Sequence, residues 1–153
     1  MTIREYELLS RHTTLRTGGP ARYFIAAQTE AEIREAIQFA SGRQLRVLVL
    51  GGGSNVLAGD GGFDGVVIHI VSRGIQRGVS LNEVVAEAGE PWDDLVAWSV
   101  GQGMPGLENL SLIPGTVGAA VAGNIGAYGV EVKDTLLWAE ALDARTGAAR
   151  RFA

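Results

Sequence analysis

Cysteine is absent from the 153-residue chain, and histidine occurs only at His12 and His69. Without thiols the chain can form no disulfide framework, no thiolate metal site and no cysteine nucleophile, and we expect no metal site. The N-terminus lacks the apolar core of a secretory signal, and glycines interrupt the longest apolar runs well before membrane-spanning length. These absences predict, by default, a cytosolic protein.

A concentration of charge of one sign is also lacking. Thirteen Lys and Arg residues stand against seventeen Asp and Glu residues, which gives a formal net charge of −4, and the basic residues are scattered. This distribution argues against nucleic acid or an anionic membrane as the main partner. The length and the hydrophobic content of 46% predict one domain, or two small lobes, with a sizeable core.

Glycine is abundant in one segment, residues 104–131. The segment contains no Lys, Arg or His, yet its interspersed apolar residues predict a packed, irregular wall rather than a flexible linker. Because glycine tolerates positive φ and a close approach to the main chain, this wall could direct backbone amides at a bulky anion such as a nucleotide pyrophosphate. A glycine-dense bend that only packs against a sheet is the alternative. The glycines that define the wall are Gly106, Gly115, Gly118, Gly123, Gly126 and Gly129.

The first half of the chain is predicted to contain a βαβ unit. Thr29 and Glu32 form a plausible capping box for a helix that ends at Gly42. The nearly continuous apolar run at residues 45–50 is typical of a strand covered on both faces, and a second glycine-rich element, residues 51–57, follows it directly. The expected elements are an arm, a strand, the helix, the apolar strand, a turn and a last strand, at residues 5–20, 22–27, 29–42, 45–50, 60–65 and 66–71.

The second half of the chain is predicted to begin after a loosened stretch at residues 72–78. This stretch is the expected boundary between a first lobe, 1–74, and a second lobe, 75–153. A helix is expected to start near Pro91, and strands are expected at residues 82–87, 135–143 and 148–152. Because the sequence stops inside the last expected strand, we interpret the chain as a fragment of a longer protein.

Neither of the common nucleotide-binding fingerprints fits residues 51–57. Val56 stands where a Rossmann fingerprint has its third glycine, no acid ends the next strand near Val71, and no Gly-Lys-Ser/Thr of a phosphate loop follows. Lys and Arg are absent from residues 47–65 and 101–131, so we expect a dinucleotide grip in which amide nests and carboxamides replace cations. An uncharged binding slot lined by amides suits a large flat ring attached to a pyrophosphate. The carboxamides are those of Asn55, Asn109 and Asn124.

Five motifs, in this order, give the sequence a specific resemblance to a known family. They are His-Thr-Thr-Leu-Arg-Thr-Gly-Gly-Pro-Ala at 12–21, Gly-Gly-Gly-Ser-Asn-Val-Leu at 51–57, Gly-Met-Pro-Gly-Leu-Glu-Asn-Leu at 103–110, Ile-Pro-Gly-Thr-Val-Gly-Ala at 113–119 and Asn-Ile-Gly-Ala-Tyr-Gly-Val-Glu at 124–131. The sequence thereby resembles the UDP-N-acetylenolpyruvoylglucosamine reductases, or UDP-N-acetylmuramate dehydrogenases. The resemblance implies an α+β flavoprotein of the PCMH, or vanillyl-alcohol-oxidase-like, fold, with FAD between two small α+β lobes.

The resemblance also implies an activity. Family members use NADPH to reduce the flavin, which passes hydride to the enolpyruvyl ether of a UDP-amino sugar and so makes UDP-N-acetylmuramate for peptidoglycan. The family's arginine after a tyrosine, its proton-donating serine and its distant glutamate have no counterpart here. The chain is therefore expected to be truncated at its C-terminus, to lack the substrate-binding domain and any catalytic residue, and to be inactive alone.

Two other hypotheses remain beside this one. The first is a stand-alone flavin-binding or nucleotide-binding module without reductase activity. The second is another oxidase of the same fold, in which a histidine would tether the flavin. Neither His12 nor His69 lies in a glycine-rich loop, so FAD is expected to be bound non-covalently.

By the same resemblance, residues 51–57 wrap the pyrophosphate of FAD, and residues 113–119 and 123–129 line the rest of the cofactor. The implied cofactor-binding residues are Leu50, Gly51, Gly52, Gly53, Ser54, Asn55, Val56, Leu57, Asn109, Ile113, Pro114, Gly115, Thr116, Val117, Gly118, Ala119, Gly123, Asn124, Ile125, Gly126, Ala127, Tyr128 and Gly129.

Three residues of the glycine wall admit two interpretations. Tyr128 either flanks the cofactor or is a packing plug among glycines. Glu108 and Glu131 either bond ribose or ribityl hydroxyls or cap the wall. His69, in an apolar strand, is interpreted as a hydrogen-bonded structural histidine rather than a base.

The helix expected after Pro91 carries two pairs of residues that could suggest chemistry. Trp92 and Trp98, at helical spacing, are interpreted as core residues rather than flavin-stacking groups. Asp93 and Asp94 are interpreted as first-turn acids that favour the helix dipole rather than as a catalytic carboxylate pair.

Overall fold

A four-stranded sheet organises the N-terminal half of the chain in the computed structural model, which describes residues 1–153. β1 (Ile3–Leu8) runs antiparallel to β2 (Pro20–Ala27), whereas β2 and β3 (Arg46–Leu50) both run parallel to β4 (Phe63–Ile70). The spatial order β1-β2-β4-β3 places β4 between β2 and β3. The predicted βαβ unit is therefore present, with a later strand inserted between its two strands.

β4 is the most deeply buried strand of the sheet. Val66, Val67 and Ile68 are all exposed by 1% or less. Their side chains alternate, because successive residues of a strand point to opposite faces. Val66 and Ile68 enter the cluster beneath the helix, whereas Val67 joins Phe24 on the opposite face. Complete burial of each such side chain stabilises the fold by about 1.5–3 kcal/mol.

α1 (Glu30–Ser41) connects β2 to β3 and covers one face of the sheet. It begins as the sequence predicts, because the Thr29 side chain accepts a hydrogen bond from the Glu32 N–H at 3.2 Å. The Glu32 carboxylate accepts one in return from the Gln28 N–H at 2.7 Å, one residue before the cap. Apolar residues at helical spacing, Ala36, Ile37 and Ala40, pack onto the sheet.

Three sequence predictions about this sheet need correction. The apolar run in β3 was expected to be covered on both faces, but β3 is an edge strand and Val49 is 57% exposed. β4 begins at Phe63, inside the predicted turn, and the predicted arm, residues 5–20, overlaps most of β1. The edge position follows from the insertion of β4, a long-range pairing that an apolar run does not encode.

The C-terminal half surrounds a separate apolar cluster. Trp92 is a buried member of this cluster and donates from its indole N–H to the Leu110 carbonyl at 2.8 Å. Trp92 is thus a core residue, as predicted, while Trp98 is only half-buried. The elements of this half are β5 (Ile75–Arg77), β6 (Val84–Ala86), α2 (Trp92–Gly101), η2 (Glu108–Leu110), α3 (Val117–Gly123), β7 (Gly126–Ala127), β8 (Val130–Glu131) and η3 (Val132–Asp134).

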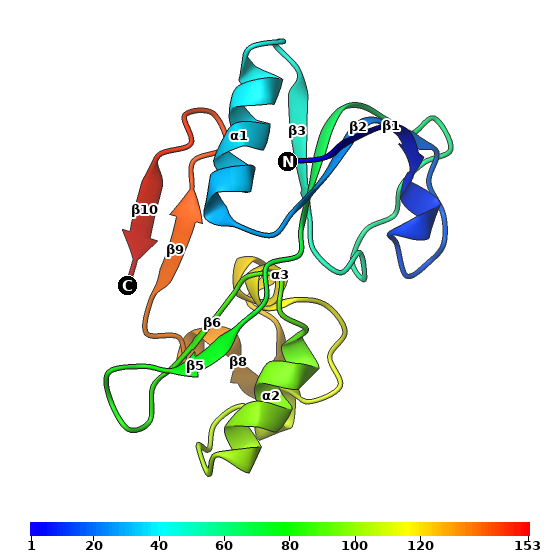
Figure 1. The fold of residues 1–153 in the computed structure, drawn as a ribbon. Coiled ribbons are helices and arrows are strands. Elements are labelled where there is room, and N and C mark those ends of the chain that lie inside the picture. The colour runs from blue at the N-terminus through cyan, green and yellow to red at the C-terminus, as the bar shows by residue number, and fades with distance from the viewer.

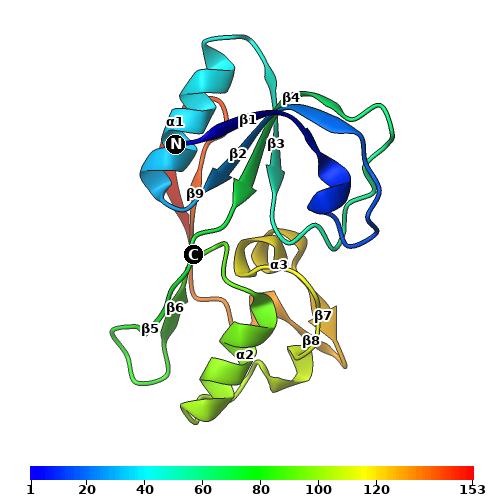
Figure 2. The same ribbon diagram turned by 45° about the vertical axis from the view of Figure 1, so that its right-hand side comes forward.

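The glycine wall is more regular than the sequence predicts, because it contains the helix α3. The small residues of α3 let it lie against neighbouring main chain, and Val117 and Ala120 pack into the second cluster. In Figures 1 and 2, α3 lies below the end of β3. β5 also lies outside the predicted elements, in the stretch at residues 72–78 that was expected to be a loosened boundary. It pairs antiparallel with β6.

A hairpin of β9 (Ala139–Leu142) and β10 (Ala149–Phe152) ends the chain, as predicted, although β9 is shorter than the expected strand. The hairpin lies beside α1 (Figure 1): Leu142 packs against the cluster under α1, and Arg34 donates to the Gly147 carbonyl. The division into lobes at residue 74 stays a prediction. None of the helices is long and apolar enough to cross a membrane, and the cytosolic location also stays a prediction.

Candidate functional site

The two glycine-rich elements lie against each other, although about sixty residues separate them in sequence. A Cβ added at Gly51 would lie 2.5 Å from Thr116 Oγ1, and one added at Gly52 would lie 3.2 Å from Gly115 Cα. The Ser54 hydroxyl joins the loops directly, because it donates to the Pro114 carbonyl at 3.0 Å. The close approach therefore requires glycine on the β3 side.

The loop after β3 turns at Gly53, which has φ +68° and is buried. A Cβ at Gly53 would lie 2.0 Å from the His12 carbonyl oxygen, so no other residue fits without movement of the main chain. The Thr14 N–H also donates to the Gly53 carbonyl at 3.1 Å. The N-terminal arm thus fixes the turn of the loop.

The backbone N–H groups of residues 51–55 donate to no acceptor within the chain. Gly53 is buried, and Gly51 and Ser54 are half-buried. Unpaired amides at such positions are unfavourable unless another group accepts their hydrogen bonds. Successive amides that curve around a glycine turn form a concave site for an anion. This cluster, called the amide nest of residues 51–55, is the candidate anion site of the molecule.

The second glycine-rich element offers fewer free amides than the sequence predicts. The Val117 N–H donates to the Glu90 carbonyl at 2.9 Å, and the Gly118 N–H donates to the Ala88 carbonyl at 2.8 Å. At Gly118 an added Cβ would also lie 2.8 Å from Ala88 Cβ, so this glycine serves packing. In contrast, Thr116 Oγ1 is buried without a hydrogen-bond partner.

Asp93 stabilises the turn at Ser111 and Leu112, which precedes the second glycine-rich element. Its Oδ1 accepts hydrogen bonds from the Leu112 N–H at 2.7 Å and from the Ser111 hydroxyl at 2.9 Å. These two bonds, that of the Leu112 N–H first, hold the pKa of the Asp93 carboxyl below its usual value. Leu112 adopts φ +63° and is 83% exposed. Asp93, interpreted from the sequence as a dipole acid alone, therefore also shapes the loop.

The third predicted segment, residues 123–129, forms the end of α3 and a tight hairpin. Asn124 has the left-handed conformation that ends the helix, and its Oδ1 accepts from the Lys133 N–H at 3.0 Å. Tyr128 and Gly129 both have positive φ between β7 and β8, as in a type I′ turn. Tyr128 is 89% exposed, so the interpretation as a packing plug is wrong.

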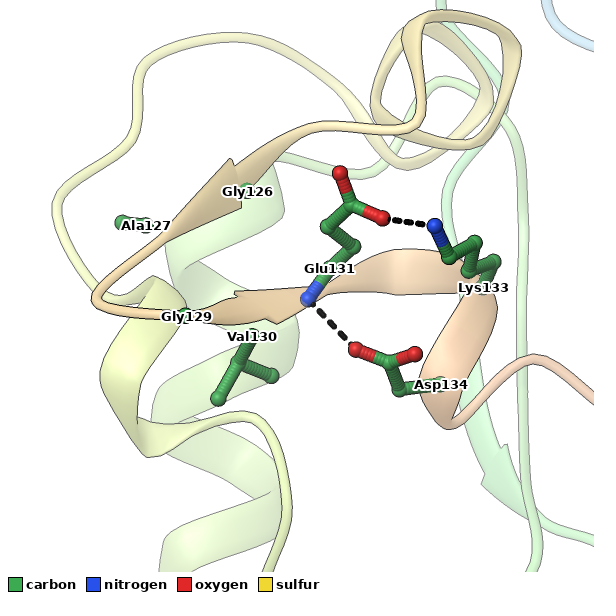
Figure 3. Close-up of a pocket in the computed structure, with 7 residues that line it drawn as sticks. All are labelled: Gly126, Ala127, Gly129, Val130, Glu131, Lys133 and Asp134. Carbon is green, nitrogen blue, oxygen red and sulfur yellow. Dashed lines mark hydrogen bonds and ion pairs between the residues drawn. The ribbon is translucent and has the colours of Figure 1, made fainter.

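An open cavity of about 590 Å³ lies beside this hairpin (Figure 3). Glu131 forms an ion pair with Lys133, which holds the pKa of the Glu131 carboxyl below its usual value and raises the pKa of the Lys133 amine. The Asp134 carboxylate accepts from the Glu131 N–H at 2.8 Å. The cavity is lined by Gly126, Ala127, Gly129, Val130, Glu131, Lys133 and Asp134.

Both glutamates proposed for sugar contacts thus have partners within the chain, since the Glu108 carboxylate accepts from the Gly106 N–H at 2.6 Å. Their contact with ribose or ribityl hydroxyls stays a prediction. Asn55 and Asn109 are exposed, and their carboxamides make no hydrogen bond within the chain.

Six predicted site residues pack their side chains in or against the two clusters nearest the glycine loops. Two of them are buried, so of these two only the main chain could face a ligand, and the other four are half-buried. The buried residues are Leu50 and Val117, and the half-buried ones are Val56, Ile113, Ile125 and Ala127. By contrast, Leu57 is 79% exposed.

A comparison with protein families matches residues 21–153 to a model described as an FAD-binding domain. The chain belongs to this family. A curated UDP-N-acetylenolpyruvoylglucosamine reductase from Saccharopolyspora erythraea is 49% identical over 145 residues, which are 93% of this chain and 40% of the relative. The reductase from Pseudomonas putida is 47% identical over 99% of this chain and 46% of the relative. The FAD-binding domain thus spans less than half the length of these curated relatives.

Solved structures confirm the predicted fold of this FAD-binding domain. The structure of UDP-N-acetylenolpyruvylglucosamine reductase (MurB) from Thermus caldophilus superimposes with a TM-score of 0.77 and 32% identity, over 99% of this chain and 53% of the other. The 6-hydroxy-D-nicotine oxidase from Arthrobacter nicotinovorans, with a TM-score of 0.69 and 19% identity over 87% of this chain and 30% of the other, shares the fold. A vanillyl-alcohol-oxidase-type flavoprotein from Myceliophthora thermophila shares it as well.

The bonds to Asp93 predict a pH-dependent contribution to stability. Because the folded-state pKa lies below the unfolded value, the contribution is present above the ordinary aspartate pKa of about 3.9 and is lost as the pH falls through the folded-state pKa. Asp93→Asn should therefore lower the free energy of unfolding at pH 7, and this difference from wild type should narrow in acid. Urea denaturation across the pH range measures both.

Asp94→Asn is the matched control, because the Asp94 carboxylate accepts no side-chain hydrogen bond of this kind and is exposed. At pH 7 its free energy of unfolding should lie closer to that of wild type than that of Asp93→Asn does. A constant difference for Asp93→Asn would mean that the carboxylate does not hold the turn.

Proposed function

We propose that this chain binds FAD non-covalently and that the amide nest of residues 51–55 holds the pyrophosphate. The observation that carries the proposal is the set of N–H groups in this loop that have no acceptor in the chain. A pyrophosphate supplies several strong acceptor oxygens, and amides bind an anion without cationic side chains. The absence of Lys and Arg from residues 47–65 agrees with this mode of binding.

The surrounding residues fit such a cofactor. Glycines at positions 51 and 52 keep the junction of the two loops narrow, and the buried Thr116 hydroxyl beside Gly51 lacks a partner. Residues 113–119 and 123–129 are proposed to line the rest of FAD, mainly through main chain and exposed apolar side chains. Both kinds of group suit a flat ring system, which needs contact area more than charge.

The reaction is proposed from the relatives, which are named as UDP-N-acetylenolpyruvoylglucosamine reductases. FAD, when bound, would accept hydride from NADPH and deliver it to the enolpyruvyl sugar. The residues of this chain would bind and orient the cofactor. No residue here is proposed as the proton donor or as the clamp for the substrate carboxylate, and those groups are expected from the remainder of a full-length reductase.

The alternative is a flavin-binding module without reductase activity. Both functions require FAD binding, so the alternative differs only in what happens when NADPH and the enolpyruvyl sugar are added. Turnover by the 153-residue chain alone would contradict our expectation that other residues complete the site.

FAD binding has a direct test. The purified chain should release FAD, identified by fluorescence and mass, when it is denatured, or should take up added FAD after purification. Protein that contains no flavin and does not bind added FAD at micromolar concentrations would contradict the proposed function.

Gly52→Val should weaken FAD binding by at least about tenfold, or about 1.4 kcal/mol, because the new side chain would wedge between the two glycine loops. Gly52 is exposed and does not have positive φ, so the variant should fold. Titration of flavin fluorescence measures the affinity. The matched control is Gly101→Val in α2, where an added Cβ meets nothing within 4 Å. Equal affinities in the two variants would exclude the loop junction from the binding site.

A further inference from the structure

The chain's two histidines lie together beside the three glycines of the amide nest, Gly51, Gly52 and Gly53. His12 comes from the arm after β1, and His69 comes from β4. Their ring centroids are 5.5 Å apart, and the His12 ring stacks on Phe24 with centroids 4.2 Å apart and an interplanar angle of 27°. Phe24 also contacts His69, with ring centroids 5.6 Å apart. The sequence separates all three rings widely, so only the fold shows this cluster.

Each histidine is connected to one end of the glycine triplet. The His12 carbonyl occupies the space that a Cβ of Gly53 would need, and the Gly53 carbonyl accepts from the Thr14 N–H two residues further along the arm. His69 is the strand partner of Leu50, which immediately precedes Gly51. The main chain of the arm thus adjoins one end of the triplet, and the strand that carries His69 adjoins the other.

The His12 ring is fixed on its other edge as well. Its Nε2 lies 3.0 Å from Glu7 Oε1 of β1, and this bond is the main cause of the lowered pKa of the Glu7 carboxyl. Arg4 and Arg11 lie near the same carboxylate, each at 3.8 Å. The ring is only 17% exposed, and the bonded carboxylate is 14% exposed.

We propose that His12 is a positioning residue for the amide nest. Held by Glu7 and by the stack on Phe24, it fixes the arm against Gly53 and keeps that residue in the left-handed conformation. The amides of residues 51–55 then converge on one anion. This inference rests on the proposed binding of FAD and adds the group that pre-organises the pyrophosphate site.

The physical reason is the freedom of the loop. Glycine populates positive and negative φ about equally, so a run of three glycines has no intrinsic preference for the nest conformation. Unpaired amides favour conformations that expose them to water. A rigid support therefore has to select the nest, and a buried, stacked and hydrogen-bonded ring provides that support.

His12→Ala removes both the stack and the bond to Glu7. FAD affinity should fall by at least about tenfold, and the phosphorus NMR signals of bound FAD at saturation should move towards those of free FAD. The visible spectrum of the bound flavin ring should remain that of wild type, because the ring is not held by this loop. A general loss of structure would change the ring spectrum and the phosphorus signals together.

Phe39→Leu is the matched control. Phe39 forms a similar aromatic pair with Tyr23, with centroids 5.1 Å apart, on the face of the sheet under α1. Its loss should leave the phosphorus signals of bound FAD unchanged. If His12→Ala does not fold, His12→Phe retains the stack and loses only the bond to Glu7, and a smaller shift of the same signals is expected.

Unchanged phosphorus signals in a folded His12 variant would overturn the inference while FAD binding by the wild type stands. Wild-type protein that binds no FAD would overturn the proposed function and the inference together.

Discussion

The structure depends on one unusual condition: a short loop whose peptide N–H groups lack acceptors is held in place by its surroundings. The sheet places this loop at the end of β3. The start of α3 and its N-cap Thr116 lie against Gly51, and Gly115 lies against Gly52. The arm after β1 packs on Gly53 from the other side. Three parts of the chain thus maintain a conformation that the loop itself would not prefer. An anion that accepts these hydrogen bonds would satisfy the unpaired N–H groups, which is why we propose the pyrophosphate of a dinucleotide cofactor as their ligand.

Much of the fold could be predicted because it is encoded locally. The capping residue Thr29 and the apolar spacing of α1 fixed the start and the buried face of that helix. The apolar run of β3 identified a strand but not its position, because the pairing of β4 between β2 and β3 is a long-range property. α3 was missed because a run of Gly, Ala and Val predicts small size rather than a particular backbone conformation.

In the candidate site, too, the features with a local sequence signal could be predicted and those that join distant elements could not. Glycine content and the absence of cations located both loops, but the loss of the Val117 and Gly118 amides to the Glu90 and Ala88 carbonyls has no local signal. The bonds from Ser111 and Leu112 to Asp93 likewise join separate elements. The cluster of His12, Phe24 and His69 could not be predicted either, because its rings come from separate elements. Sequence therefore indicated the kind of ligand, and only the fold shows which main-chain groups remain free.

The central claim is that the free amides of residues 51–55 donate hydrogen bonds to the pyrophosphate of FAD. Titration of isotopically labelled protein with FAD, followed by proton–nitrogen correlation NMR, observes these amides individually. The account predicts that their protons shift downfield most, while those of Val117 and Gly118, already bonded within the chain, move little. Saturation with FAD that leaves residues 51–55 unmoved would contradict it.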